Sequence, residues 1–467
     1  MPVVNLGLDL GSTGLRAACA APGEPARPLA LPEGLWPWPL CEVATRGPLP
    51  VAFSSLKGRL GDERPVRVDG HTLSAREAVT RALAAVREHV ARETSADIGH
   101  TVISVPARYE SARRTALRDA AHAAGLGELR LISDSLAAAV GHTEGEGSGT
   151  LLVYGMGHSG FELGLVRGAR GYYRALGYEG GSTPGGASFD AEILTEALTL
   201  LRRHRTKVAA DSMDEAGWAR LLGRVQRVKA TLGSVEVTSA GEEAQADEAA
   251  PSVLALDPNG RVLVQFGAAG FAAFLRQHVE QTLGRTESLL DQAGLEPSDV
   301  DTVLLVGGSG AMAEVRGAVA RLAPQYAMAT PGLLAHGAAL HAERLSRAPH
   351  AGSDDRAVPG TDEPYEERAS TPLPPLTATV LSQPGSEPGI EEARRWAAEG
   401  RVTEARELLL HLVAEAQHLL SELPAPGLSP APGLSPVPGP APAPDRRPAP
   451  RPGRHPGAGP APRPAPA

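Results

Sequence analysis

Three short apolar runs, far apart in the chain, each end in a glycine-rich turn. The runs with their turns cover residues 6–14, 152–161 and 303–310. An apolar run of this length that stops at glycines is typical of a buried strand. Backbone N–H groups in such a turn can form a nest for anionic oxygens, and glycine lets a ligand approach the backbone closely. Taken alone, each turn is open to two interpretations: an ordinary tight connection, or part of a phosphate-binding site.

The first 345 residues alternate between strand-like and helical segments. We expect strands at 3–10, 101–105, 129–132, 150–154, 161–166 and 302–306, and helices at 72–93, 110–124, 191–204 and 214–232. Ser74 and Glu77 have the spacing of a capping box at the start of the helix over 72–93. This order of strands and helices predicts an α/β or α+β layered domain over residues 1–345.

The composition changes near residue 345. Pro, Gly, Ser and acidic residues dominate 346–388, which predicts a flexible linker. Residues 389–423 have helical spacing broken at Gly400, which predicts a helical hairpin; it is either a simple pair docked in cis or similar to one tetratricopeptide unit. Residues 424–467 are mostly Pro, Ala and Gly, so they have little to bury and we expect a disordered tail.

Charge and cysteine content narrow the class of partner. The 45 Lys and Arg residues against 54 Asp and Glu residues give a net charge of −9, which argues against a nucleic-acid partner. Cys19 and Cys41 are too few for a disulfide framework, and we expect no disulfides. No apolar stretch reaches about 18 residues and the N-terminus lacks a signal-peptide pattern, so we expect no membrane span and a cytoplasmic location.

Taken together and in order, these segments resemble the nucleotide-binding domain of DnaK-type heat-shock chaperones, in the actin/hexokinase superfamily. The most specific stretch runs from Val102-Ile103-Ser104-Val105-Pro106-Ala107 to Ile132-Ser133-Asp134-Ser135-Leu136-Ala137-Ala138-Ala139, and is similar to the family's "VITVPA … NEP-TAAA" segment. The resemblance covers about residues 1–345. It implies a two-lobed, actin-like ATPase domain that binds ATP or ADP with Mg²⁺ and works with a protein partner or co-chaperone.

The resemblance also implies the roles of individual residues. The catalytic residues would be Lys57, Asp134 and Asp9, and Asp9 would hold Mg²⁺ through water. The nucleotide would be bound by Gly11, Ser12, Thr13, Gly155, Gly157, Gly185, Gly186, Lys229, Gly307, Gly308 and Ser309.

The second glycine turn departs from the family pattern. The family reads Asp-Leu-Gly-Gly-Gly-Thr-Phe-Asp, whereas residues 155–162 read Gly-Met-Gly-His-Ser-Gly-Phe-Glu. The first acidic residue is therefore Gly155 and the phosphate-binding threonine is Gly160, while His158, Ser159 and Glu162 are candidates to replace the missing carboxylate. The other departures are Asp134 for a Glu, Ala311 for an Arg that packs on adenine, and Gln226 and Ala230 on the adenine helix.

Three functions are compatible with this pattern. The first is a divergent, chaperone-like ATP-binding protein with slow or absent hydrolysis, because losing a positioned acid–base group costs about 10²–10⁴ in rate. The second is a pseudo-ATPase that serves only as a scaffold or adaptor. A sugar or acid kinase of the same superfamily is disfavoured, since no substrate motif separates the two phosphate loops. After residue 345 the sequence shows no series of alternating β-branched strands, so we expect no peptide-binding domain there.

Overall fold

The computed structural model describes residues 2–37, 40–43, 51–68, 71–203, 215–235, 252–256, 262–323, 326–347 and 378–382. The strands are β1 Val3–Leu10, β2 Leu15–Ala20, β3 Arg27–Leu29, β4 Leu40–Val43, β5 Val51–Ser54, β6 Val66–Val68, β7 His71–Leu73, β8 Asp97–Val105, β9 Leu129–Ser133, β10 Gly149–Met156, β11 Phe161–Ala169, β12 Tyr172–Gly181, β13 Ser252–Ala255, β14 Leu263–Phe266, β15 Thr302–Val306, β16 Tyr326–Met328 and β17 Ala378–Ser382. The helices are α1 Leu56–Arg59, α2 Ala75–Thr94, α3 Ser111–Ala123, α4 Asp134–His142, α5 Gly186–Arg203, α6 Glu215–Ser234, α8 Ala268–Ala293, α9 Ala313–Leu322 and α10 Leu333–Arg347, with 3-10 turns η2 Pro297–Asp299 and η3 Gly308–Ala311.

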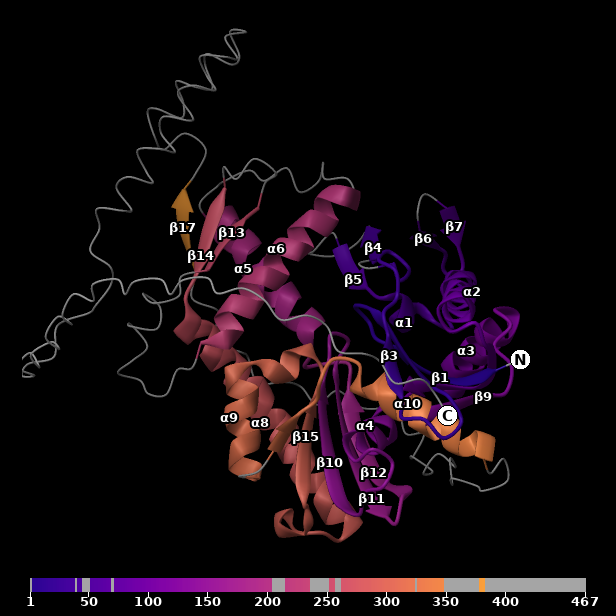
Figure 1. Cartoon of the computed structure of the whole chain (residues 1–467). Coiled ribbons are helices and arrows are strands. Elements are labelled where there is room, and N and C mark those ends of the chain that lie inside the picture. The colour runs from indigo at the N-terminus through magenta and orange to yellow at the C-terminus, as the bar shows by residue number, and fades with distance from the viewer. Residues whose placement is uncertain are drawn as a thin grey trace, which may run out of the picture. The chain divides into compact units, whose positions relative to one another are not determined.

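Within the described residues, two five-stranded sheets follow the same plan (Figure 1). Their strand orders are β3-β2-β1-β8-β9 and β12-β11-β10-β15-β16. In the first sheet β1 pairs antiparallel with β2 and parallel with β8. In the second, β10 pairs antiparallel with β11 and parallel with β15. This repeated arrangement, with helices around each sheet, confirms the expected α/β, two-lobed, actin-like fold.

Helix α2 shows how the sequence pattern builds the first lobe. The Ser74 Oγ accepts a hydrogen bond from the Glu77 N–H at 3.1 Å, and a Glu77 carboxylate oxygen accepts one from the Ser74 N–H at 2.8 Å. The capping box is therefore present as predicted. The apolar face of the helix, including Val79, Leu83 and Val86, is fully buried in a core shared with β1 and α3.

A second core fills the other lobe. It joins β10 and β11 to α5, α6, α8 and α9 and contains the buried aromatic side chains of Phe161, Phe189, Phe271 and Phe274. The few aromatic residues of this chain are therefore concentrated in the second lobe, whereas the first relies mainly on Leu, Val and Ala.

Helices α4 and α10 pack against each other between the two sheets, and α10 also packs on β1 (Figure 1). The approach is so close that only glycine fits at two positions. A Cβ on Gly337 would lie 1.9 Å from the Ala137 carbonyl oxygen, and one on Gly7 would lie 2.1 Å from the Ala339 nitrogen. Helix α10 was not among the predicted helices, yet its N-terminus brings residues 329–334 to the site described below.

The predicted strands and helices of the first 345 residues are present, with ends that differ by a few residues. Strand β12 was not predicted, and α10 runs two residues beyond the expected domain end at 345. Within the segment expected to be a linker, residues 378–382 form β17, which pairs antiparallel with β14. The remainder of that segment, the helical hairpin 389–423 and the tail 424–467 lie outside the described residues. None of the described helices is both long and apolar enough to cross a membrane.

Candidate functional site

A cavity of about 590 Å³ lies where the three glycine turns meet. Ligand pockets for small molecules typically measure about 300–1,000 Å³, so the space suits a ligand of nucleotide size. Of the fourteen residues to which the resemblance gives a catalytic or nucleotide-binding role, ten line it: Asp9, Gly11, Ser12, Thr13, Lys57, Asp134, Gly155, Gly157, Gly307 and Gly308.

Strand register places the second and third turns side by side. In the parallel pair β10 and β15, Gly155 lies opposite Val306, so both strands end at the same edge of the sheet. Gly307, the first residue of the third turn, has φ +92°. A Cβ on Gly307 would lie 2.5 Å from the Met156 carbonyl oxygen, so this close approach of the two turns requires glycine.

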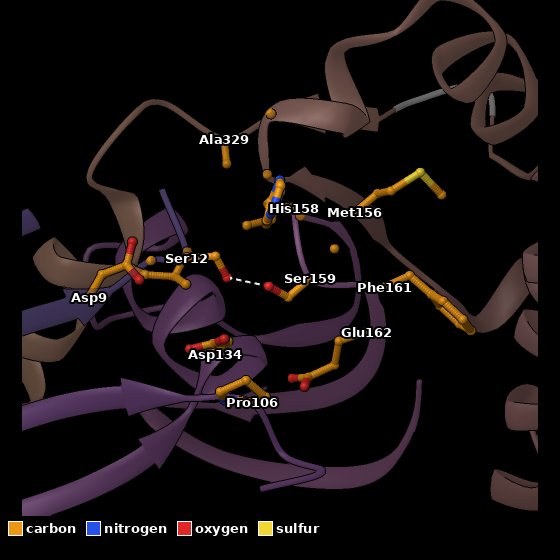
Figure 2. Close-up of a pocket in the computed structure, with 18 of the residues that line it drawn as sticks. Asp9, Ser12, Pro106, Asp134, Met156, His158, Ser159, Phe161, Glu162 and Ala329 are labelled. Carbon is orange, nitrogen blue, oxygen red and sulfur yellow. Dashed lines mark hydrogen bonds between the residues drawn. The ribbon is translucent and has the colours of Figure 1, made fainter. Parts of the chain in front are cut away.

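A direct hydrogen bond joins the first turn to the second. The Ser12 and Ser159 hydroxyl oxygens are 2.8 Å apart, as the dashed line in Figure 2 shows. Ser12 follows β1 of the first sheet and Ser159 follows β10 of the second, so this contact connects the two lobes across the site. The sequence did not predict it.

Lys57 and Asp134 form an ion pair on the cavity wall, with the Lys57 Nζ 3.4 Å from an Asp134 carboxylate oxygen. The Ser133 hydroxyl caps α4, accepting from the Leu136 N–H at 3.1 Å, which leaves the Asp134 side chain available for the cavity. The other Asp134 oxygen is buried and has no hydrogen-bond partner among the described residues. Burial lowers the pKa of Lys57, but the negative charge of Asp134 and its other neighbours outweighs that effect and raises it.

Asp9 forms an ion pair with Arg16, which was not among the predicted site residues. Arg16 lies directly opposite Asp9 in the β1–β2 hairpin, with its Nη1 3.4 Å from an Asp9 oxygen. Burial raises the pKa of the Asp9 carboxyl, although the positive charges of Lys57 and Arg16 oppose the rise. Counting residues across the Gly11–Gly14 turn would have found this pairing, because partners in a hairpin share one face of the sheet.

The second turn carries its carboxyl group on the returning strand. Gly155 lines the cavity without a side chain, and Glu162 lies opposite it in β11. One Glu162 oxygen accepts from the Ala107 N–H at 2.8 Å, while the other is buried without a partner in the described part of the chain. Burial, together with the charge of Asp134, raises the pKa of Glu162 to about 8, so at neutral pH this carboxyl group is mainly protonated. Figure 2 shows Glu162 and Asp134 in the same part of the pocket.

His158 faces away from this carboxyl group. Its ring Nδ1 is 3.9 Å from an oxygen of the buried Asp190, and the Lys229 Nζ is 2.8 Å from the other oxygen. Burial, reinforced by the charge of Lys229, lowers the pKa of His158 to about 4, so the ring is neutral at pH 7. His158 therefore belongs to a buried cluster behind the turn.

Four predicted residues support the second turn from behind and do not line the cavity: Gly185, Gly186, Lys229 and Ser309. The Gly186 N–H donates to the Gly157 carbonyl at 2.9 Å, and the Lys229 Nζ donates to the Gly186 carbonyl at 3.0 Å. The Ser309 hydroxyl lies 3.4 Å from that same Gly157 oxygen. A Cβ on Gly185 would lie 2.4 Å from the Gly160 nitrogen, so the segment just before α5 packs tightly against the turn.

Several lining residues lie in or near the stretch that carries the family resemblance, but the sequence assigned them no role in the site. Arg108 donates from its Nη2 to the Ser159 carbonyl at 3.0 Å, and Arg113 stacks over the Tyr109 ring with a distance of 5.8 Å to its centroid. The Tyr109 hydroxyl donates to the Lys57 carbonyl at 2.8 Å. Arginines that follow a strand end are common on protein surfaces, so only the tertiary structure shows that these face a cavity.

Comparison with known proteins agrees with this architecture. Two relatives from Burkholderia pseudomallei, strains 668 and 1710b, are both named chaperone protein HscA homolog. Each is 30% identical to this chain over 292 residues, covering 62% of this chain and 44% of the relative. The chain thus spans less than half the length of these relatives. A model of the Hsp70 protein family matches residues 54–352, which is more than half of the chain. This chain therefore belongs to the Hsp70 family.

Proposed function

We propose that this chain binds ATP and ADP in the cavity and couples its nucleotide state to a protein partner, as a divergent chaperone-like protein. The observation that carries the proposal is the convergence of three glycine turns, from β1, β10 and β15, with the Lys57–Asp134 pair on one cavity. Membership of the Hsp70 family and the names of the two chaperone relatives support it.

Each turn would contact a different part of the bound nucleotide. The phosphates would lie between Gly11–Thr13 and Gly157–Ser159, where they would replace the Ser12–Ser159 hydrogen bond and meet the hydroxyls of both turns. The nucleoside would lie against the third turn. No atom lies within 4 Å of the position that a Cβ on Gly308 would take, so a ring can approach the backbone there.

Slow or absent hydrolysis is the expected chemistry. Phosphoryl transfer to water depends on charge stabilisation and on a positioned water molecule. Lys57 can stabilise charge on the terminal phosphate, and the unpartnered oxygen of Asp134 can accept a hydrogen bond from the water. Gly155 supplies no carboxylate, and Glu162 is mainly protonated at neutral pH, so the second turn holds little carboxylate that could act as a general base.

Magnesium, which the resemblance implies, fits the donor set of this cavity poorly. Mg²⁺ in nucleotide sites prefers one or two free carboxylates together with phosphate oxygens. Among the described lining residues the carboxyl groups are Asp9, Asp134 and Glu162. Asp9 is paired with Arg16, Asp134 is paired with Lys57, and Glu162 is mainly protonated.

A pseudo-ATPase scaffold is the second candidate. The absent carboxylate at Gly155 and the Ser12–Ser159 hydrogen bond, which lies where phosphates would enter, favour it. In either case we propose a cytoplasmic protein, in keeping with the free, buried thiol of Cys19.

Thermal unfolding of the full chain with ATP, ADP or neither, each in Mg²⁺ and in EDTA, tests the proposal. A ligand at 100 times its dissociation constant stabilises a protein by about 2.7 kcal/mol, so binding would be visible as a raised Tm. The absence of stabilisation by both nucleotides in both buffers would contradict the proposal and favour the scaffold.

Measuring phosphate release from ATP then distinguishes a weak ATPase from a kinase. A slow, steady release that Lys57→Ala abolishes would identify a weak ATPase, with nucleotide binding by the variant as the control for its fold. Release only in the presence of a small-molecule acceptor would instead identify a kinase and contradict the chaperone-like assignment.

A further inference from the structure

Arg16 lies over the first glycine turn as well as beside Asp9. Its Nη1 atom is 3.0 Å from the position that a Cβ on Gly11 would occupy, and the residue lines the cavity. Its side chain is 42% exposed, whereas that of Asp9 is only 11% exposed. The guanidinium therefore has one edge toward a buried carboxylate and further N–H donors available toward the space of the cavity.

We propose that Arg16 binds the polyphosphate directly and takes the charge-neutralising place of a magnesium ion, so that nucleotide binding by this chain does not require Mg²⁺. The inference rests on the proposed function and names the group that recognises the phosphates. A planar guanidinium can donate to a carboxylate and a phosphate at the same time, and arginine is always charged.

The charge balance of the cavity supports this assignment. In the described lining, four cationic side chains face three carboxyl groups; the cations are Arg16, Lys57, Arg108 and Arg113. One of the three carboxyl groups, Glu162, is mainly protonated at neutral pH. The lining is therefore cationic and can accept a polyanion without a further positive ion.

A magnesium ion at Asp9 would have to compete with this arrangement. It would need to displace the Arg16 guanidinium from the Asp9 oxygen and enter a region already positive from Lys57 and Arg16. Gly155, at the matching position of the second hairpin, offers no second carboxylate as compensation. A phosphate oxygen approaching Arg16 meets neither obstacle.

Isothermal titration of the full chain with ATP, in Mg²⁺ and in EDTA, tests the inference. For the unmodified chain we expect dissociation constants that agree within about threefold between the two buffers. We expect Arg16→Ala to weaken binding in EDTA by about tenfold or more, since a charge-assisted contact is lost. The matched control, Arg118→Ala, removes an exposed arginine of α3 that does not line the cavity, and should leave the affinity unchanged.

The possible outcomes separate this inference from the proposed function. ATP binding that disappears in EDTA would overturn the role of Arg16 and leave nucleotide binding intact. Unchanged affinity of a folded Arg16→Ala variant in EDTA would overturn it as well. Binding in neither buffer would overturn both proposals. If Arg16→Ala fails to fold, Arg16→Lys replaces it: we expect weaker binding than for the unmodified chain, because lysine lacks the planar fork, and equal affinity would count against the inference.

Discussion

The β1–β2 and β10–β11 hairpins occupy the same place in the two sheets, but they carry different charges. In the first, Asp9 at the strand end faces Arg16 on the returning strand. In the second, Gly155 takes the place of the acid, and the residue opposite is Glu162. The backbone plan is thus repeated while the charge pattern is not. This difference indicates that hairpin geometry is set by pairing and packing, whereas side chains facing the cavity can change without loss of the fold.

The turns of the two hairpins differ in backbone conformation too. Gly160 has φ +126°, and a Cβ there would lie 2.0 Å from the Gly181 carbonyl oxygen. Gly14 has no atom within 4 Å of the corresponding position. The threonine that the family resemblance places at Gly160 would therefore not fit this turn, which explains that departure in physical terms.

The largest expected effect comes from a methyl group at these two glycines. Gly160→Ala should destabilise the fold by about 3 kcal/mol or more, because the residue must leave its backbone conformation and displace a neighbouring strand. Gly14→Ala should change stability by about 1 kcal/mol at most. Urea unfolding measures both, and equal effects would show that the two turns do not differ as described.

The pH dependence of stability tests whether Glu162, in the second hairpin, is protonated in the folded state. The pKa of Glu162 is about 8, raised from 4.5, so the folded state holds a proton that the unfolded chain releases, and stability is lost as pH rises from 4.5 to 8. Glu162→Gln removes this loss, so the variant should gain on the order of 3 kcal/mol relative to the unmodified chain between pH 5 and pH 8. Exposed Glu88→Gln is the control. A difference that stays constant with pH would contradict the assignment.

Exchanging the charge pattern between the hairpins tests whether Arg16 replaces the metal. The double variant Arg16→Ala/Gly155→Asp removes the cation and restores a second carboxylate, so Mg²⁺ should strengthen its ATP binding by about tenfold, unlike that of the unmodified chain. A Cβ at residue 155 would lie 3.1 Å from the Glu162 carbonyl oxygen, which requires only a small shift. If calorimetry finds that Mg²⁺ does not change the ATP affinity of the double variant, the proposal that Arg16 replaces the metal is wrong.

The smallest effect concerns the contact between the two turns. The Ser12–Ser159 hydrogen bond should contribute about 1 kcal/mol to stability, as measured by a double-mutant cycle with Ser12→Ala and Ser159→Ala. ATP should reduce this coupling if phosphates enter between the turns. A coupling energy near zero without nucleotide would mean that the hairpins do not depend on each other.

Much of the fold could be predicted because it follows from local rules. The capping box of α2, the apolar face of the same helix and the strand–turn–strand pattern around residues 150–166 are set by residues close in sequence. The family resemblance added the grouping of Asp9, Lys57 and Asp134, which the structure places on one cavity. Strand β12 and helices α8 and α10 are among the elements that escaped prediction.

The sequence by itself determined many of the strands and helices, the glycine turns and the loss of a carboxylate at Gly155, because each depends on neighbouring residues or on identity alone. Only the tertiary structure decided how the side chains are used. Arg16 covers the first turn, His158 turns back toward Asp190, and Ser12 reaches Ser159. The physical reason is that burial and long-range packing, rather than residue type, decide which charges meet and which groups face the cavity.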